Sequence, residues 1–351
     1  MTRRHWLLVP LLAAPVLGLG VHYAYWRMAA DRLTEGLAIW RTQRQQAGWT
    51  SMMGPAEAGG YPLAATVSLR DVVVQSAGAG IQGGLRWQAG RVVLRVTLWQ
   101  PRLLQIQVEG TQQLRLAEQP EIPFQADRLR LVLPLEHGLP RWGELSITQL
   151  RAGLPIGGII IGDVRGRADL RPAAPQGEAA ITFALRAEKI HLPEQRSWPL
   201  GPDITQAALD GTVGGPLPRG GAPAASLGQA AGQWRDGGGT VEISELALQW
   251  GKLDVHASAT LALDAQLQPM GTGMARLRGH DAALDALVAA GALGPSVARM
   301  ARTMIALFAT PATPPDGADG AVELPLTLQE RRLLSRQLPL AKLPLLPWPG
   351  G

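Results

Sequence analysis

The chain contains no cysteine, which excludes several kinds of chemistry before any motif is considered. Disulfide bonds, thiol nucleophiles and cysteine-ligated metal sites all need that residue. Lysine is also scarce, since only Lys189, Lys252 and Lys342 occur among 33 basic residues. Arginine therefore carries the excess of five basic residues, and it is spread along the chain. We expect no nucleic-acid partner, whereas attraction to anionic lipid headgroups stays open.

Motifs that carry catalytic or cofactor chemistry are also missing. The chain has no G-x-S-x-G, P-loop, H-E-x-x-H or EF-hand spacing, and its six histidines are widely separated. Gly78, Gly80 and Gly83 form a G-x-G-x-x-G pattern, but a dinucleotide site needs a helix after it, and strand-like residues follow here. We expect no enzyme, no metal ion and no cofactor.

What the chain does contain is apolar sequence interrupted by turn residues. Hydrophobic residues make up 46% of the 351 positions and charged residues only 17%. The 42 glycines and 28 prolines are scattered between apolar stretches rather than gathered in polar tracts. This composition predicts a folded chain of many short strands and turns instead of a disordered one.

The N-terminus carries a long uncharged stretch at residues 6–26. It follows Arg3 and Arg4, and it is long enough to cross the hydrocarbon core of a bilayer. We expect a single-pass signal anchor in a bacterial inner membrane, with residues 1–5 in the cytoplasm and the bulk of the chain in the periplasm. The residues expected in the membrane include Trp6, Leu7, Leu8, Val9, Leu11, Leu12, Val16, Leu17, Leu19, Val21 and Tyr25.

Two alternatives compete with the uncleaved anchor. A cleaved signal peptide would need small residues at its cleavage site, and the His22-Tyr23-Ala24 sequence matches that rule poorly. A buried core helix would be disturbed by Pro10 and Pro15.

Beyond the anchor, residues 27–48 predict a juxtamembrane helix. Leu33, Leu37 and Trp40 recur at helical spacing, and Gly48 is a residue that commonly ends a helix. We expect this helix to pack onto the domain that follows.

From about residue 64 the apolar pattern has a period of two, as in strands with one buried face. The clearest examples are residues 253–263 and 129–135, where apolar residues alternate with polar ones. Short connections between such stretches favour an antiparallel meander. In residues 241–250 the apolar residues change from odd positions (Val241, Ile243) to even positions (Leu246, Leu248, Trp250), which predicts a β-bulge. The expected fold class is therefore mainly β, as a curled sheet or open groove, with an N-terminal transmembrane helix and a few accessory helices near the C-terminal end.

Two segments break the period of two and divide the chain. Residues 214–239 are rich in Gly, Pro and Ala and contain a short helical pattern, so we expect a connection between two β-rich parts at 49–213 and 240–351. Residues 281–309 carry a helical stripe and predict a helical insertion in the second part.

Several short motifs follow one another along the chain beyond the anchor. They are Gly60-Tyr61-Pro62, Trp87, Trp99-Gln100-Pro101, Leu209-Asp210-Gly211, Trp234 with Gly237 to Gly239, Trp250-Gly251, and Leu263-Asp264 with Pro269-x-Gly271. Their order resembles the alphaproteobacterial domain-of-unknown-function family 2125. The resemblance covers nearly the whole chain beyond the anchor, and the family implies no catalytic residues.

The architecture also resembles AsmA-like envelope proteins, whose association with lipid handling implies an amphiphile as ligand. A twisted sheet curled on its apolar face can leave a groove for acyl chains, with the helix of residues 297–308 as a cover or plug. The alternative is a filled sandwich without a ligand. The residues expected to line the groove are Leu129, Leu131, Leu133, Leu253, Val255, Leu261, Leu263, Met304 and Phe308.

The function expected from the sequence is a non-enzymatic, membrane-anchored envelope protein that binds or passes a lipid or other amphiphile. One alternative is a structural or scaffolding protein that binds another envelope protein. A hydrolase is the weakest alternative.

Overall fold

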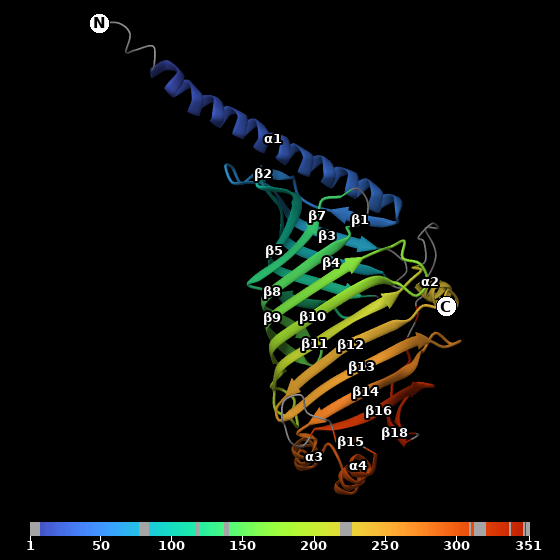
Figure 1. Ribbon diagram of the computed structural model, residues 1–351. Coiled ribbons are helices and arrows are strands. Elements are labelled where there is room, and N and C mark those ends of the chain that lie inside the picture. The colour runs from blue at the N-terminus through green and yellow to red at the C-terminus, as the bar shows by residue number, and fades with distance from the viewer. Residues whose placement is uncertain are drawn as a thin grey trace.

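Most of the protein is one antiparallel β-sheet (Figure 1). The computed structural model describes residues 8–76, 84–116, 119–136, 140–217, 227–308, 310–311, 321–336, 338–346 and 348. Within these residues the sheet has 18 strands, and four helices lie outside it. The prediction of a mainly β, antiparallel protein with a few helices is confirmed. The G-x-G-x-x-G pattern at residues 78–83 lies outside the described residues.

The strands follow one another along the chain, with the helices at its start and between later strands. The helices are α1 (Leu8–Gln46), α2 (Leu227–Asp236), α3 (His280–Ala289) and α4 (Pro295–Phe308). The strands are β1 (Trp49–Met52), β2 (Glu57–Gly59), β3 (Ala64–Ser76), β4 (Leu85–Thr97), β5 (Gln100–Leu116), β6 (Ile122–Gln125), β7 (Arg128–Pro134), β8 (Trp142–Leu154), β9 (Gly157–Leu170), β10 (Ala179–His191), β11 (Asp203–Gly214), β12 (Val241–Trp250), β13 (Leu253–Leu263), β14 (Pro269–Arg278), β15 (Thr310–Pro311), β16 (Val322–Gln329), β17 (Arg332–Ser335) and β18 (Leu338–Lys342).

Pairing in the sheet is almost entirely between neighbours in the chain. Both β1 and β2 pair with β3, and β6 and β7 together occupy the position between β5 and β8. From β8 to β14 every strand pairs with the next one. The pairing of β11 with β12 bridges the connection at residues 214–239, so the two expected β-rich parts form one sheet. The pairing of β14 with β16 likewise bridges α3 and α4, which coincide with the helical segment expected at 281–309.

The register places apolar residues on one face of the sheet across its whole width. Leu94 of β4 lies opposite Ile106 of β5, and Ile106 lies opposite Leu131 of β7. Farther along, Leu209 of β11 lies opposite Leu246 of β12. The β-bulge predicted in residues 241–250 is confirmed, because the register of β12 shifts between Ile243 and Leu246. The bulge keeps Leu246 on the same face as Ile243 despite their odd spacing.

Helix α1 is one continuous helix of 39 residues that crosses the first strands of the sheet (Figure 1). Its C-terminal half packs on the apolar face of the sheet, where Trp26, Ala30 and Leu33 are buried. The indole Nε1 of Trp26 donates a hydrogen bond to the carbonyl oxygen of Ala64 at 2.9 Å and so fixes the helix on the start of β3. The helix therefore closes one end of the sheet.

The N-terminal part of α1 extends beyond the sheet (Figure 1). Leu17, Leu19 and Val21 expose 68%, 62% and 71% of their surface. Over the part of the chain that the structure describes, no helix combines the length and the apolar character that a membrane crossing requires. Trp6 and Leu7, the first two residues of the expected anchor, lie outside the described residues.

Helices α3 and α4 lie at the end of the sheet opposite to α1 (Figure 1). Arg302 of α4 joins the two helices, because its guanidinium pairs with Asp281 at 3.3 Å and with Asp285 at 2.5 Å. These acceptors hold the guanidinium in its charged form and raise the pKa of Arg302. The two helices therefore form a small unit at the last strands, far from α1.

Candidate binding groove

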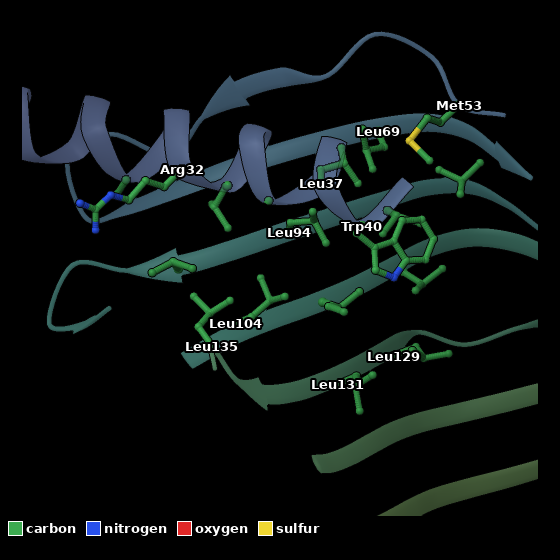
Figure 2. A pocket seen from close by; sticks show the side chains of 18 of the residues that line it. Arg32, Leu37, Trp40, Met53, Leu69, Leu94, Leu104, Leu129, Leu131 and Leu135 are labelled. Atoms are coloured by element: carbon green, nitrogen blue, oxygen red, sulfur yellow. The ribbon is translucent and has the colours of Figure 1, made fainter. Parts of the chain in front are cut away.

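A groove of about 980 Å³ runs between α1 and the apolar face of the first strands. Figure 2 shows that its walls come from α1 on one side and from β3, β4, β5 and β7 on the other. The lining is mainly aliphatic and includes Leu37, Trp40, Leu69, Leu94, Leu104 and Leu131.

The sequence produces these apolar walls by two different periods. Leu33, Leu37 and Trp40 recur at intervals of four and three residues, which places them on one face of a helix. Leu94 and Val96 are two residues apart, which places both on one face of β4. The two apolar faces meet where α1 crosses the sheet.

A glycine of α1 leaves the helix side of the groove open. Gly36 lines the groove, and apart from its two chain neighbours and the surrounding backbone of α1 no atom lies within 4 Å of the position that a Cβ would take there. The space beside Gly36 is therefore part of the groove, and a larger side chain at this position would occupy it.

One end of the groove carries charged side chains. Arg32, Arg102 and Glu136 all belong to its lining, and Figure 2 shows Arg32 at the end remote from Met53. Glu136 is paired with Arg141 at 3.2 Å. Neither Arg32 nor Arg102 has an ion pair with any described residue, and both are exposed. This end of the groove therefore offers two free positive charges to a ligand.

A buried polar group lies among the apolar residues of the lining. Gln112 is only 2% exposed, and its Oε1 accepts a hydrogen bond from Nε1 of Trp87 at 3.2 Å. Because the indole can only donate, this contact fixes which end of the amide faces Trp87. The Gln112 Nε2 atom is buried and has no hydrogen-bond partner in the described structure. It is a hydrogen-bond donor without an acceptor in the wall of the groove.

The structure brings together only some of the residues predicted to line a groove. Leu129 and Leu131 line it, whereas Leu133 lies on the same strand outside the lining. Leu253, Val255, Leu261 and Leu263 lie half-buried on β13, many strands away.

The two predicted lining residues from the C-terminal helical segment lie on α4. Met304 is half-buried there, and Phe308 is the last residue of that helix, with its side chain outside the description. This helix packs against α3 and β16 rather than beside the groove of α1.

Sequence reasoning missed several residues of the groove. The helical spacing of Leu37 and Trp40 identified an amphipathic helix, but nothing in the sequence showed which strands it would cover. No sequence pattern singles out Gln112, because a glutamine in a strand is usually a solvent-facing residue. It lies opposite Ala89 of β4 and Phe124 of β6, and only the structure reveals this register.

Three histidines form acid–histidine contacts, but they lie outside the groove. His191 Nδ1 is 2.7 Å from an oxygen of Asp203, and His256 Nε2 is 3.2 Å from Asp254. The hydrogen bond to Asp203 raises the pKa of His191. His280 is 3.7 Å from Asp281. None of these histidines lines the groove, and the described residues contain no cluster of three or more His, Asp or Glu that could hold a metal ion.

Comparisons with known proteins identify the family of the chain. No curated protein and no solved structure matched it. The resemblance to AsmA-like proteins has no support from these comparisons and stays a prediction. The model of one family, described as an uncharacterized protein conserved in bacteria (DUF2125), matches residues 26–344. That match extends from the middle of α1 to just beyond β18, and the chain therefore belongs to the DUF2125 family.

Proposed function

We propose that this protein is a non-enzymatic, membrane-anchored envelope protein that binds an amphiphile, with the ligand's hydrocarbon chain in the groove beneath α1. The observation that carries this proposal is the mainly aliphatic groove of about 980 Å³. Small-molecule sites span about 300–1,000 Å³, so this groove has room for a large ligand. Its lining suits a hydrocarbon chain better than a sugar or a nucleotide.

The energetics favour a long chain over a short one. Each methylene transferred from water into an apolar site contributes about 0.8 kcal/mol. Ten methylenes would contribute about 8 kcal/mol, which is comparable with the estimated cost of about 4–15 kcal/mol for immobilising a ligand. A ligand with a long acyl chain is therefore the class expected to bind.

The polar groups of the groove suggest the orientation of the ligand. Arg32 and Arg102 would receive an anionic or zwitterionic headgroup at the charged end. The Nε2 atom of Gln112 would donate to an oxygen atom of the ligand, such as an ester carbonyl. Few but well-placed polar groups in an apolar site are typical of ligand pockets.

The proposed location follows from α1. Its exposed Leu17, Leu19 and Val21 continue the apolar stretch that begins after Arg3 and Arg4. We propose that this stretch crosses the inner membrane once, with the N-terminus in the cytoplasm and the sheet in the periplasm. Because the same helix forms a wall of the groove, a lipid could pass between the bilayer and the groove over a short distance.

A substitution at Gly36 tests the proposal without removing any contact of the folded chain. Gly36→Phe places a ring in the open space of the groove, where we expect it to exclude an acyl chain. The full chain, purified in an uncharged detergent, should carry co-purified lipid that mass spectrometry detects. We expect Gly36→Phe to lower the amount of bound lipid about tenfold, which corresponds to about 1.4 kcal/mol of lost binding.

The matched control is Gly20→Phe on the same helix. Gly20 also has no neighbouring atom within 4 Å of its Cβ position, but it does not line the groove. This variant should carry as much lipid as the unmodified protein. Absence of lipid from the unmodified protein, or equal lipid in both variants, would contradict the proposal and favour the scaffolding alternative.

A further inference from the structure

The face of the sheet opposite to the groove carries a row of arginines. Arg130 of β7 lies opposite Ser146 of β8, Ser146 lies opposite Arg165 of β9, and Arg165 lies opposite Arg186 of β10. Three of four consecutive positions across the strands are therefore arginine. Residues in such a row project from the same face of a sheet. The alternation of the strands places this face away from Leu129, Leu131 and the groove.

The charges of this row are only partly balanced. Arg186 pairs with Asp210 at 3.5 Å. Arg130 and Arg165 make no ion pair with any of the residues in the described ranges, and the Nε of Arg130 is buried without a hydrogen-bond partner. Like charges directly opposite each other on a sheet destabilise it. The direct pairing of Arg165 with Arg186 is thus a cost, which the ion pair of Arg186 with Asp210 offsets only in part.

Next to the row, a neighbouring arginine is already fully engaged. Arg167 pairs with Glu144 at 2.5 Å and with Asp169 at 2.9 Å, and it lies 5.5 Å from the ring centre of Trp142. These carboxylates raise the pKa of Arg167, the hydrogen bond to Asp169 most of all. Glu144, Asp169 and Asp210 are therefore paired with Arg167 and Arg186. Asp163, two residues before Arg165 on the same face, is paired with Lys189 at 3.9 Å, so Arg130 and Arg165 keep no ion pair within the described residues.

The row lines part of a second cavity, and the ion-paired Arg167 and Glu144 belong to the same lining. This cavity has a volume of about 490 Å³, and Arg130, Ser146, Arg165 and Arg186 all line it together with Gln105. Its lining is more polar than that of the groove, since guanidinium, hydroxyl and amide groups converge on it. Hydrogen-bond donors with surplus positive charge are the groups that bind oxyanions.

We propose that Arg130, Ser146, Arg165 and Arg186 form a binding site for a phosphoryl group. Adjacent strands are about 4.8 Å apart, so Arg130 and Arg165, two strands apart, have backbones about 10 Å from each other. Two guanidinium groups on long side chains can converge on one phosphoryl group across that distance, with the Ser146 hydroxyl between them. Arg186 completes the site from the next strand. The bound anion would neutralise the repulsion between Arg165 and Arg186.

Titration with inorganic pyrophosphate tests this site. The full chain in an uncharged detergent should bind pyrophosphate in isothermal titration calorimetry at constant ionic strength. Arg165→Gln removes one unpaired charge from an exposed position and no ion pair that the described structure contains. We expect this variant to bind pyrophosphate about tenfold more weakly, because it loses a charge-assisted hydrogen bond to the anion.

The matched control is Arg128→Gln, which makes the same change of charge. Arg128 is exposed on the same strand as Arg130, but it lies opposite Thr148 and does not line the cavity. Its affinity for pyrophosphate should stay within about twofold of the unmodified protein. Equal loss of affinity in both variants would show that binding depends on net charge alone and would overturn the proposal. Absence of pyrophosphate binding in the unmodified protein would also overturn it.

Thermal unfolding gives a second measurement that a purely structural role would not reproduce. Without pyrophosphate, Arg165→Gln should unfold no earlier than the unmodified protein, because it relieves the repulsion with Arg186. With pyrophosphate, the unmodified protein should gain thermal stability and the variant should gain less. A variant that unfolds earlier without the anion would show that Arg165 supports the fold and would overturn the proposal.

The source of the phosphoryl group is distinguished by reconstitution. The protein in phosphatidylcholine vesicles is compared with the protein in vesicles that also contain phosphatidylglycerol. If pyrophosphate binds more weakly in the anionic vesicles than in the phosphatidylcholine vesicles, and Arg165→Gln shows no such difference, the site is assigned to lipid headgroups. Unchanged binding would assign it to a soluble phosphorylated molecule.

Discussion

Two regions of the same apolar face differ in how deeply they are buried. In the covered region, which is β3 to β5 beneath α1, Val67 and Leu69 expose 0% and 3% of their surface. In the open region, which is β10 to β14, Leu185 and Leu246 expose 43% and 38%. In both regions apolar and polar residues alternate along the strands. The comparison shows that alternation determines which face is apolar, whereas a separate element decides whether that face is covered.

The two regions should also differ in what stabilises them. Burial of apolar surface contributes about 25 cal/mol per Å², so the covered region gains from packing against α1. In the open region, stability depends more on the hydrogen bonds between strands and on contacts within one layer. Substitutions that remove apolar side chains should therefore have large effects beneath α1 and small ones in the open region.

The largest loss of stability is expected from a substitution at the residue that fixes α1 to the sheet. Trp26→Ala removes a ring that is 8% exposed, its hydrogen bond to Ala64 and its edge contact with Tyr61 at 5.5 Å between ring centres. We expect the free energy of unfolding to fall by about 3–5 kcal/mol, as measured by urea denaturation of the full chain in detergent. Trp26→Phe keeps most of the packing and should lose less. A loss below about 1 kcal/mol in the alanine variant would show that α1 does not stabilise the covered region.

An intermediate effect should separate two leucines of the same face. Leu69→Ala in the covered region should lower the free energy of unfolding by about 2–5 kcal/mol. Leu246→Ala in the open region should lower it by about 1 kcal/mol, because its side chain is already partly solvated. Both values come from the same denaturation experiment. Equal losses would mean that a further partner covers the open region in solution.

The smallest effect on stability is expected from an exposed polar pair at the end of the open region. Asp203 raises the pKa of His191 through a hydrogen bond of 2.7 Å between β10 and β11. The pair therefore contributes stability below the unfolded pKa of about 6.5, and this contribution is lost as the pH rises through the higher folded value. Asp203→Asn should lower the pKa of His191 in an NMR titration and flatten the dependence of stability on pH in that window.

The control for this pair is Asp254→Asn, which changes the partner of His256 and not that of His191. It should leave the titration of His191 unchanged. An unchanged pKa of His191 in Asp203→Asn would contradict the role given to the hydrogen bond.

The strands were predictable from sequence because their signal is local. The alternation from Leu253 to Leu263 predicted β13, and the parity slip before Leu246 predicted the bulge of β12. Both features depend only on residues next to each other in the chain, where the period of two determines the face. The antiparallel meander followed from the short connections.

The position of the groove was not predictable for a physical reason. Leu131 and Val255 both lie in stretches with the same alternating pattern, so both were equally good candidates for the lining. Only the packing of α1 on β3 distinguishes them, and that packing depends on residues about 40 positions apart, such as Trp26 and Ala64. The arginine row was equally hidden, because it requires the register of four strands.

The neighbour-to-neighbour pairing of the sheet has a consequence for how the protein is made. A strand that pairs with the strand before it in the chain can be added to the growing edge of the sheet as soon as it has been synthesised, without waiting for distant sequence. The groove is lined by residues from Tyr25 to Leu145, so its walls are complete when less than half of the chain has emerged. The groove can thus form while the open region is still being synthesised.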